Sequence, residues 1–579
     1  MQPDGVVFDS PRTPAGKGEL AGVSLLLVVA LCVAAPVLGH GFVFDDRDFL
    51  VDNPTIHTPS GLLKGFCEPY WNSAGHSAAL PYHRPLGITA FTALWLLGGG
   101  RAWVFHLASL AIHLACAVLV VRIARRAGAT PWGAALGGML FALHPAQVET
   151  FAWSTCLTEL MSTAGVLAAL HAWLRRRPAA MGTWLLAGLL AKESAVAGAV
   201  VLGLAEVLGA RSRRVFLALF LASLAALVLR VGALGWPAAV RVSVPAPTVS
   251  GLSSHPSMLD LGGWMSLQQL RIIAPGAGRP FADPPAPAAP SDPRAWLLLI
   301  LPSACLLSLI LLLRHSSAAH APGPAVLGLL LATAGILPSV LVGDLARPPL
   351  ADRFLHLPLA GSALVASACI TRASRVSRAA ARCAIIVGAI LALGAAARSA
   401  AILPHWRCDE TFFRWAVASG PQVALPYAGR AQSLLDQAQA LPRGHPDRIR
   451  FADAALEILR IGARRVAGLP HAPVHGAELI RTSEGHARYV RGDLAGAERI
   501  YLEVLDGNSV SLAAHLGMGC LLAQKGEDAW GWGAEAEAAV RLRAALEHFT
   551  IVLDSSPWSL TGAREGAARA RLLLAACSG

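Results

Sequence analysis

Long apolar segments separated by short polar loops fill the chain from about Leu20 to residue 404. Such segments are typical of membrane-spanning helices, because a helix satisfies its own backbone hydrogen bonds in lipid. Beyond that point, amphipathic helical periodicity and a higher density of charge replace the continuous apolarity. The pattern predicts an all-α protein with a cytoplasmic tail over 1–18, a polytopic membrane bundle over 19–404 and a soluble helical domain over 405–579.

Clusters of basic residues between the apolar segments determine the predicted topology. They are Arg122/Arg125/Arg126, Arg175–Arg177, Arg211/Arg213/Arg214, Arg314/His315 and Arg372/Arg375/Arg378. Cytoplasmic loops carry the excess of Lys and Arg, which predicts about eleven spans with the N-terminus inside and the C-terminus outside. After the first span at 20–39, the assigned segments include 130–143, 151–174, 182–209, 214–232, 295–313, 322–342, 354–370 and 383–403, with a Pro- and Gly-rich outer loop at 236–293.

The segment 182–209 is long enough for one helix, but the distribution of loop charge requires two crossings there. Lys192 and Glu193 interrupt it, so we interpret it as a hairpin of two short or tilted helices with this pair at the outer tip. An additional crossing at 85–99 would place every basic cluster on the outer side, so we do not assign 85–99 as a span. We place that stretch as an interfacial or re-entrant helix in the first outer loop, 40–100.

The composition agrees with a membrane protein and excludes other classes. Of the 579 residues 55% are hydrophobic and 15% charged, and a soluble protein could not bury so much apolar surface. The net charge of +12 lies in the loop clusters and does not indicate a nucleic-acid partner. The ten cysteines form no CxxC motif, so neither a metal site nor a disulfide framework is predicted. No cleavage site follows the first apolar segment, so we expect a retained helix.

The C-terminal region carries a degenerate repeat pattern. Two sets of residues have the spacing of a tetratricopeptide repeat: Gly485, Ala497, Tyr501, Val504 and Ser509, and Ala545, Phe549, Val552 and Pro557. An insertion over 526–537 breaks the strict period. A nonrepetitive helical domain is the alternative. Stacked helix pairs would present a concave surface to a peptide or protein.

The stretch GFVFDDRDFLVDNPTIH, Gly41–His57, follows the first span and concentrates acids in a basic chain. A solvated loop with an Asx turn at Asp52-Asn53-Pro54 is one interpretation. Acids at the exit of a membrane helix are also placed to act at the interface, where a lipid-linked substrate presents its head group. Asp45 and Asp46 are therefore the candidate catalytic residues. We favour Asp46 as the general base and keep Asp45 as the alternative.

The predicted topology collects further polar residues on the same outer side. The candidates for donor phosphate and substrate binding are Arg84, His144, Glu149, Lys192, Glu193, Asp352 and Arg353, and Tyr82, His83, Gln147, Asp344, Arg347 and His356 lie near them. Simpler explanations exist: His144 would end a helix, Lys192 would extend toward lipid head groups, and Arg353 would pair with Asp352. Cations and carboxylates gathered at one bilayer face favour a polyprenyl-phosphate substrate.

Several motifs, in order along nearly the whole chain, resemble one known family. They are FDDRDFLVDNP (44–54), YHRPLGITAFTALW (82–95), FHLASLAIHL (105–114), FALHPAQVETFAWSTCLTELMSTAG (141–165), LAGLLAKESAVAG (186–198), LADRFLHLPLAG (350–361) and HWRCDETFFRWAVASGP (405–421). The family is that of the transmembrane and tetratricopeptide repeat-containing proteins and their bacterial relatives, in the GT-C glycosyltransferase superfamily.

The resemblance implies transfer of a monosaccharide, mannose in the animal members, from a polyprenyl phosphate to a hydroxyl group such as that of protein Ser or Thr. It implies inversion at the anomeric centre, with an acid of the first outer loop as base. Asp45 and Asp46 match the family's acidic pair. A lipid-linked sugar is then the donor, and no other cofactor is predicted.

The leading hypothesis is therefore an inverting membrane glycosyltransferase. A noncatalytic membrane scaffold that presents tetratricopeptide repeats is the main alternative, although it has no use for the acidic pair. A transporter is disfavoured, because the acids lie at the outer face and not at the bilayer midplane. The Ala, Arg and Gly bias suggests a GC-rich bacterium. We then expect the cell membrane, with the C-terminal domain periplasmic or extracellular.

Overall fold

The computed structural model describes residues 17–70, 82–208, 211–236, 271, 308, 323–338, 351–467, 474–555 and 561–577. Every regular element in these ranges is helical, which confirms the predicted all-α class. The chain divides into two compact units. The first holds Met1–Phe42, Ile56–Tyr70 and Pro81–Arg407, and the second includes Val43–Thr55 and Cys408–Gly579.

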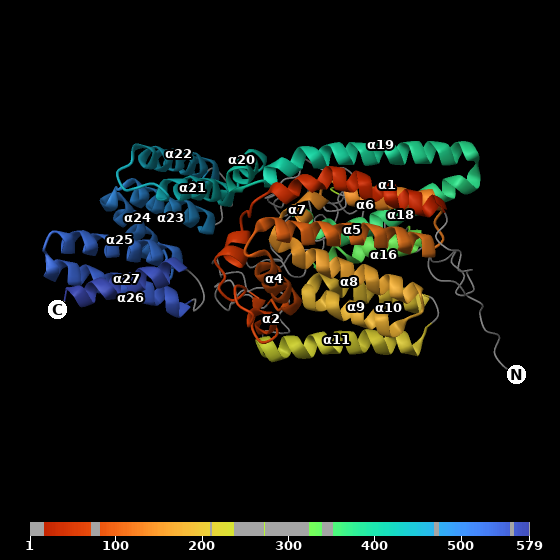
Figure 1. Ribbon diagram of the computed structural model, residues 1–579, viewed down its shortest axis with the longest axis horizontal. Helices are drawn as coiled ribbons and strands as arrows, with labels where there is room; N and C mark the ends of the chain where they lie inside the picture. Colours follow the sequence, from red (N-terminus) through yellow and green to blue (C-terminus); the bar gives the residue numbers. More distant parts are fainter. Residues whose placement is uncertain are drawn as a thin grey trace, which may run out of the picture. The chain divides into compact units, whose positions relative to one another are not determined.

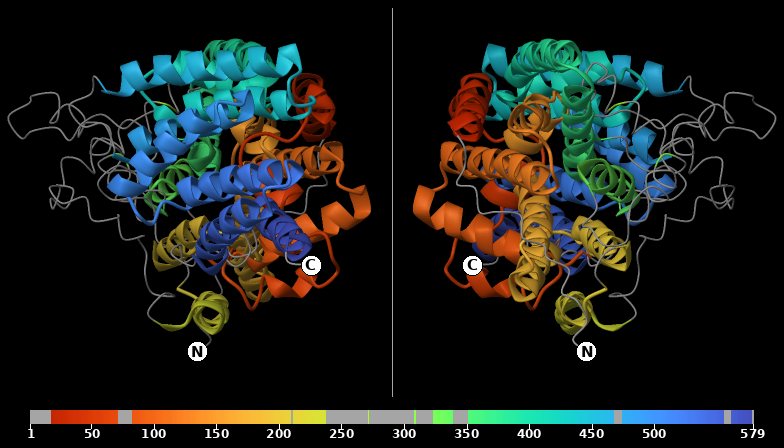
Figure 2. Two further views of the ribbon diagram at one scale, coloured as in Figure 1. Left: turned by 90° about the vertical axis from the view of Figure 1, so that its left-hand side faces the viewer. Right: turned by 90° about the vertical axis from the view of Figure 1, so that its right-hand side faces the viewer.

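The first unit is a bundle of apolar helices (Figure 1). Its helices are α1 (Lys17–Ala34), α2 (Gly61–Lys64), α4 (Pro85–Gly98), α5 (Ala102–Arg126), α6 (Pro131–Leu143), α7 (Gln147–Ala152), α8 (Leu157–Leu174), α9 (Pro178–Ala191), α10 (Val196–Leu208), α11 (Arg213–Leu234), α16 (Pro324–Ala334), α18 (His356–Val376) and α19 (Arg378–Ile402). Helix α11, in yellow, runs horizontally along the bundle in Figure 1. It is therefore seen nearly end-on in the view of Figure 2, which is turned by 90°.

Six helical segments among the described residues are long and apolar enough to cross a membrane. They are Gly18–Gly39, Ala102–Arg126, Ser154–Leu174, Arg213–Leu234, Asp352–Val376 and Arg378–Trp406. The helices α4, α6, α9 and α16 are apolar but shorter. The chain is therefore an integral membrane protein. The predicted span 295–313 and the loop 236–293 lie outside the described residues except at Trp236, Arg271 and Ser308, and the count of eleven spans stays a prediction.

The predicted break inside 182–209 is confirmed. Helix α9 ends at Ala191, Lys192 is extended with φ −162° and ψ 146°, and α10 begins at Val196 after one 3-10 turn. Helix α9 packs closely on α8 where Gly165 faces Gly188. The two backbones leave no room for a side chain there, since a Cβ on Gly165 would lie 2.7 Å from the Cα of Gly188. This close approach positions Lys192 beside α8.

Helix α6 lies at the centre of the first unit, against α1, α5, α18 and α19. Its contact with α18 depends on Gly137, where a Cβ would lie 2.6 Å from the carbonyl oxygen of Ala363. Pro131 begins α6, and Thr130 caps it by accepting a hydrogen bond from the Gly133 N–H at 3.2 Å. The chain leaves α6 at His144, whose extended backbone ends the helix before Pro145.

The second unit contains eight helices among its described residues. They are α20 (Asp409–Ser419), α21 (Ala424–Gln439), α22 (Pro446–Ala467), α23 (Val474–Arg491), α24 (Leu494–Gly507), α25 (Leu512–Gly531), α26 (Glu535–Ser555) and α27 (Thr561–Ala576). Each helix from α20 onward packs on the next one. The packing of α25 on α26 is more extensive than the packing of α24 on α25.

Most residues of the repeat pattern are buried between these helices, whereas Ser509 is exposed and Pro557 lies outside the described residues. Tyr501 of α24 fills the space left by Gly485 of α23, where a Cβ would lie 2.6 Å from its ring. Phe549 of α26 occupies the corresponding place and is fully buried. The insertion at 526–537 lengthens α25 and α26 and forms the turn between them. The assignment as tetratricopeptide repeats stays a prediction.

Candidate functional site

Polar side chains of the first unit meet around the ring of Phe354. The Nζ atom of Lys192 lies 5.5 Å from the ring centroid, and the guanidinium carbon of Arg353 lies 4.9 Å from it. Residues from the α9–α10 connection and from the turn before α18 therefore meet, although about 160 positions separate them in sequence. The term polar layer is used below for three ion pairs: Lys192 with Glu159, Arg353 with Glu149, and Arg84 with Glu193.

Lys192 is paired with an acid inside a candidate membrane span. Its Nζ lies 2.7 Å from Oε2 of Glu159 on α8, and the two side chains are 10% and 3% exposed. Ser194 donates a hydrogen bond to Oε1 of the same carboxylate at 3.1 Å. The expectation that Lys192 extends toward lipid head groups is wrong in this structure, because the ammonium points inward to a buried partner.

Arg353 is paired across the unit with Glu149 of α7. Its Nη1 lies 2.6 Å from Oε1 of Glu149, and the Asp352 N–H donates to Oε2 at 3.1 Å. The guanidinium also lies over the Trp153 ring at 5.0 Å. Asp352 forms its own ion pair with Arg271. The simpler explanation of a local pair between Arg353 and Asp352 is therefore wrong, and each has a distant partner.

Arg84 and Glu193 form a third pair, whose side chains are 12% and 18% exposed. Both guanidinium hydrogen bonds go to the two carboxylate oxygens, one of them at 2.9 Å, and the Arg84 guanidinium lies over the rings of Tyr70 and Tyr82. Burial alone would raise the pKa of the Glu193 carboxyl, but the charge and hydrogen bonds of Arg84 and the charge of Lys192 lower this pKa to about 2. Glu193 is therefore ionised at neutral pH.

His144 lies at the end of α6, as the simpler explanation predicted. The Ala146 N–H donates to its Nδ1 at 3.2 Å, so the neutral ring carries its proton on Nε2. Nearby in sequence, Gln147 of α7 contacts Nδ1 of His356 on α18, and both residues are buried. The helix ends of α6, α7 and α18 thus converge on the side of the polar layer.

Asp45 and Asp46 lie in the second unit, in a short structured segment and not in a solvated loop. Asp46 is fully buried and accepts a hydrogen bond from the Val43 N–H at 3.2 Å, whereas Asp45 is half-buried. The next residues form a single π-helical turn, closed by a 2.8 Å hydrogen bond from the Asp52 N–H to the Arg47 carbonyl. The Asx turn expected at Asp52-Asn53-Pro54 is present, and Asn53 forms it by accepting a hydrogen bond from the Thr55 N–H.

Strain and long-range contacts hold this acidic segment. Phe44 has φ +53°, in the left-handed region that a bulky side chain rarely adopts. Its N–H donates to Asp409 at 2.8 Å, and its ring packs on Phe412 and Phe413 of α20. Arg47 bonds to Asp436 of α21 at 2.6 Å. The acidic pair is therefore held by the first helices of the C-terminal domain. A strained residue immediately before two acids is typical of a functional site.

Sequence analysis missed Glu159, the buried partner of Lys192. An acid within an apolar span is by itself a sign of function, and that signal was present in the segment 151–174. Arg271 and Ser194 were missed without a comparable signal. Asp344 and Arg347 lie outside the described residues. The described part of the chain holds no group of three metal-binding side chains.

The polar layer is nearly balanced in charge. Lys192, Arg84 and Arg353 each face a carboxylate, so a phosphate bound here would share these cations with the acids that hold them. Such an arrangement leaves none of these three cations without a counter-charge among the apolar helices. It can stabilise a phosphate leaving group, provided that the substrate lies within hydrogen-bond distance.

No protein-family model matches the chain. It is 32% identical over 197 residues to the protein O-mannosyl-transferase Tmtc2 of Drosophila melanogaster, a match that covers 31% of this chain and 21% of that protein. It is 28% identical over 204 residues to Tmtc1 of the same species, covering 33% and 23%, and 25% identical over 160 residues to human TMTC3, covering 28% and 17%. The chain thus spans about a fifth of the length of these relatives. The resemblance stated from the motifs is confirmed, and the chain is a relative of these proteins.

Proposed function

We propose that this protein is an inverting membrane glycosyltransferase that moves a monosaccharide from a polyprenyl phosphate to a hydroxyl group. The observation that carries the proposal is the relationship to proteins named O-mannosyl-transferases, together with the polar layer at the helix ends of an integral membrane protein. The predicted topology of about eleven spans, with the C-terminal domain outside the cytoplasm, is part of the proposal.

In the proposed reaction, an aspartate of the acidic pair takes the proton of the acceptor hydroxyl. The acceptor oxygen forms a bond to the anomeric carbon while the bond from that carbon to the phosphate oxygen breaks. The lipid phosphate leaves with the bonding electron pair, from the face opposite to attack, so the configuration inverts. Lys192 and Arg353 would stabilise the charge that develops on the phosphate.

The environment of the two aspartates supports a division of roles. Asp46 is fully buried and accepts the Val43 N–H, which suits a residue that positions its neighbour. Asp45 is half-buried and therefore more accessible to an acceptor hydroxyl. We therefore assign the base to Asp45, in place of the preference for Asp46 based on sequence, with mannose and protein Ser/Thr as the sugar and acceptor to be tested first.

The test is transfer of radiolabelled sugar from polyprenyl-phosphate donors by the purified full chain. Asp45→Asn preserves shape but removes basicity and should lower turnover by about 10²–10⁴. Asp48→Asn is the matched control, because Asp48 is exposed in the same segment and has no assigned role. If Asp45→Asn and Asp46→Asn both retain full transfer activity, the mechanism is wrong and a noncatalytic scaffold becomes the better explanation.

A further inference from the structure

An apolar groove of about 490 Å³ lies between α6, α18 and α19, within the membrane-spanning part of the first unit. Its walls are mostly apolar, with Leu140, Leu359, Ala363, Ile390 and Leu391 among them, and Ser362 adds a hydroxyl. The side of α19 beside the groove exposes the apolar side chains Ile386, Val387 and Leu393. A hydrocarbon chain from the bilayer can therefore enter it sideways.

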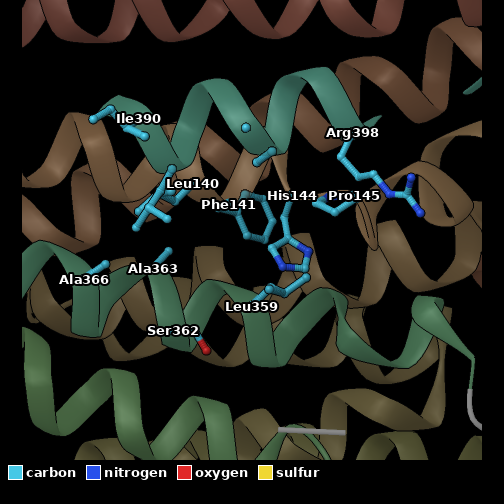
Figure 3. Close-up of a pocket in the computed structure, with 13 residues that line it drawn as sticks. Leu140, Phe141, His144, Pro145, Leu359, Ser362, Ala363, Ala366, Ile390 and Arg398 are labelled. Carbon is cyan, nitrogen blue, oxygen red and sulfur yellow. The ribbon is translucent and has the colours of Figure 1, made fainter. Parts of the chain in front are cut away.

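The groove changes from apolar to basic along its length. Figure 3 shows Ile390 and Ala366 at one end, and His144 and Arg398 at the other. The basic end is where α6 finishes and α19 approaches its last turn. A 2.8 Å hydrogen bond from Ser399 to the Leu143 carbonyl fixes the two helices to each other there. The arrangement matches a lipid with an anionic head and an apolar tail.

Arg398 differs from the three cations of the polar layer, because its side chain is exposed. Lys192, Arg84 and Arg353 each have a carboxylate partner, whereas no carboxylate among the described residues lies within ion-pair distance of Arg398. A cation within a membrane helix is expensive unless it finds a counter-ion. Its guanidinium geometry suits phosphate oxygens, which it can bind with two parallel hydrogen bonds.

Small residues widen the groove along its length. Ala363 and Ala366 form one wall, and Gly394 and Ala395 the other. A Cβ built on Gly394 would meet no atom within 4 Å, so the space beside it is open. A methyl-branched isoprenoid chain needs more width than a linear acyl chain, and this profile therefore favours a polyprenyl tail.

We infer that the groove binds the isoprenoid chain of a polyprenyl phosphate, with Arg398 beside His144 as a further cation for the phosphate, in addition to Lys192 and Arg353. This assignment rests on the proposed function for the type of lipid, and it adds a binding residue, Arg398, and a tail site. His144 then connects the groove to the polar layer, because α7 with Glu149 begins three residues after it.

Binding is tested directly with undecaprenyl phosphate and the purified full chain in detergent, by native mass spectrometry. Gly394→Leu adds a side chain to the groove lining at a position where a Cβ meets no atom within 4 Å, and Arg398→Gln removes the charge. Each should weaken binding roughly tenfold or more, as expected for loss of a charge-assisted contact or of the tail site. The matched controls are Gly232→Leu on α11, where a Cβ also meets no atom, and Arg382→Gln, exposed on the same helix as Arg398. Both controls should bind as the wild type does.

The outcomes separate this inference from the proposed function. Wild-type affinity in Gly394→Leu or Arg398→Gln overturns the inference, even if the protein transfers sugar. Equal binding of phosphatidylglycerol in competition overturns the assignment to an isoprenoid lipid. If undecaprenyl phosphate binds with the predicted variant pattern but no sugar is transferred from any polyprenyl-phosphate donor, the groove assignment stands and the proposed function fails.

Discussion

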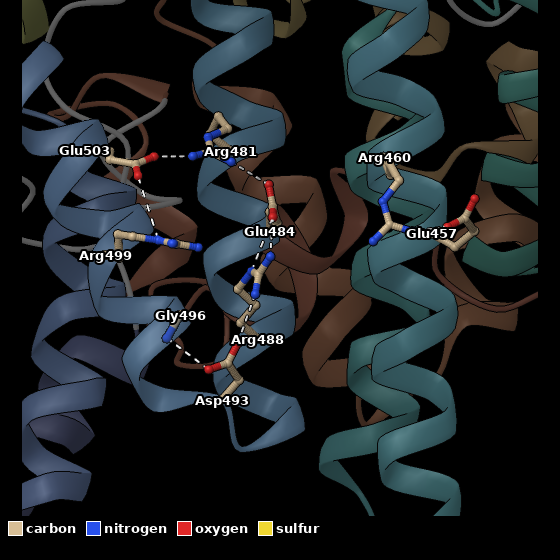
Figure 4. A network of polar contacts seen from close by, with 9 residues as sticks. All are labelled: Glu457, Arg460, Arg481, Glu484, Arg488, Asp493, Gly496, Arg499 and Glu503. Atoms are coloured by element: carbon tan, nitrogen blue, oxygen red, sulfur yellow. Dashed lines mark hydrogen bonds and ion pairs between the residues drawn. The ribbon is translucent and has the colours of Figure 1, made fainter.

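Ion pairs in the two units of this protein are built in different ways. In the first unit, Arg84 pairs with Glu193 and Arg353 pairs with Glu149, over sequence separations of 109 and 204 residues. In the C-terminal helices many pairs join residues one turn apart, such as Arg460 with Glu457 (Figure 4). The long-range pairs of the first unit connect different elements, whereas pairs such as Arg460 with Glu457 lie on the surface of a single helix. Similar side chains therefore have different roles.

Exposure separates the two kinds of pair further. The side chains of Lys192 and Glu159 are 10% and 3% exposed, whereas those of Arg460 and Glu457 are 57% and 55% exposed. Water screens the exposed pair, and a buried pair that loses one partner leaves an uncompensated charge. We therefore expect the polar layer to tolerate single changes poorly and paired changes better.

The largest expected effect comes from Glu193→Gln, which leaves Arg84 buried without its counter-charge. Breaking a buried ion pair costs about 3–5 kcal/mol of stability. Thermal unfolding of the purified chain in detergent should show a lower midpoint, or the yield of folded protein should fall. If Glu193→Gln were as stable as the wild type, the conclusion that ion pairs of the first unit are more important for stability than exposed pairs would be wrong.

The pH dependence of stability sharpens the same comparison. The pKa of Glu193 is lowered from 4.5 to about 2 in the folded protein by Arg84 and Lys192, against the effect of burial. The unfolded chain therefore binds more protons in this range, and the stabilisation is complete above pH 4.5 and lost as the pH falls toward 2. The difference in thermal midpoint between wild type and Glu193→Gln should shrink between pH 6 and pH 3. A constant difference would contradict the assigned shift.

A paired change tests whether Lys192 binds substrate or only holds Glu159. Lys192→Met with Glu159→Gln removes both charges at similar volume, so stability should change little. If Lys192 contacts the donor phosphate, transfer should still fall roughly tenfold or more, because a charge-assisted contact contributes about 1.5–3 kcal/mol. Transfer kinetics and thermal unfolding are measured together. Unchanged kinetics in a folded double variant would assign Lys192 a purely structural role.

Local features of the first unit were predictable from sequence. Lys192 and Glu193 interrupt an apolar stretch, and α9 ends there. His144 before Pro145 predicted a helix end, because a residue before proline avoids the helical conformation. These predictions succeeded because a few neighbouring residues determine each feature.

The partners of the charged residues could not be predicted in this way. Arg353 and Asp352 are adjacent, yet they pair with Glu149 and Arg271. Only the packing of α7 against the turn before α18 brings Glu149 to Arg353. The strain at Phe44 likewise depends on contacts with α20, hundreds of residues away. Sequence therefore identified which residues carry charge at the candidate site, but not how the charges are balanced.

The smallest expected effect is that of Glu457→Gln on α22. Its partner Arg460 lies one turn away and both are exposed, so the change should be within about 0.5 kcal/mol, or a midpoint shift of about 2 °C at most. Glu484→Gln is the informative companion, because Glu484 joins Arg481 and Arg488 in the network of Figure 4. Glu484→Gln should lower the free energy of unfolding by more than Glu457→Gln does and by less than Glu193→Gln does. Surface charges in a network contribute more to stability than an isolated exposed pair and less than a buried pair. If Glu457→Gln destabilises the chain as much as Glu193→Gln, burial does not explain the difference between the two units.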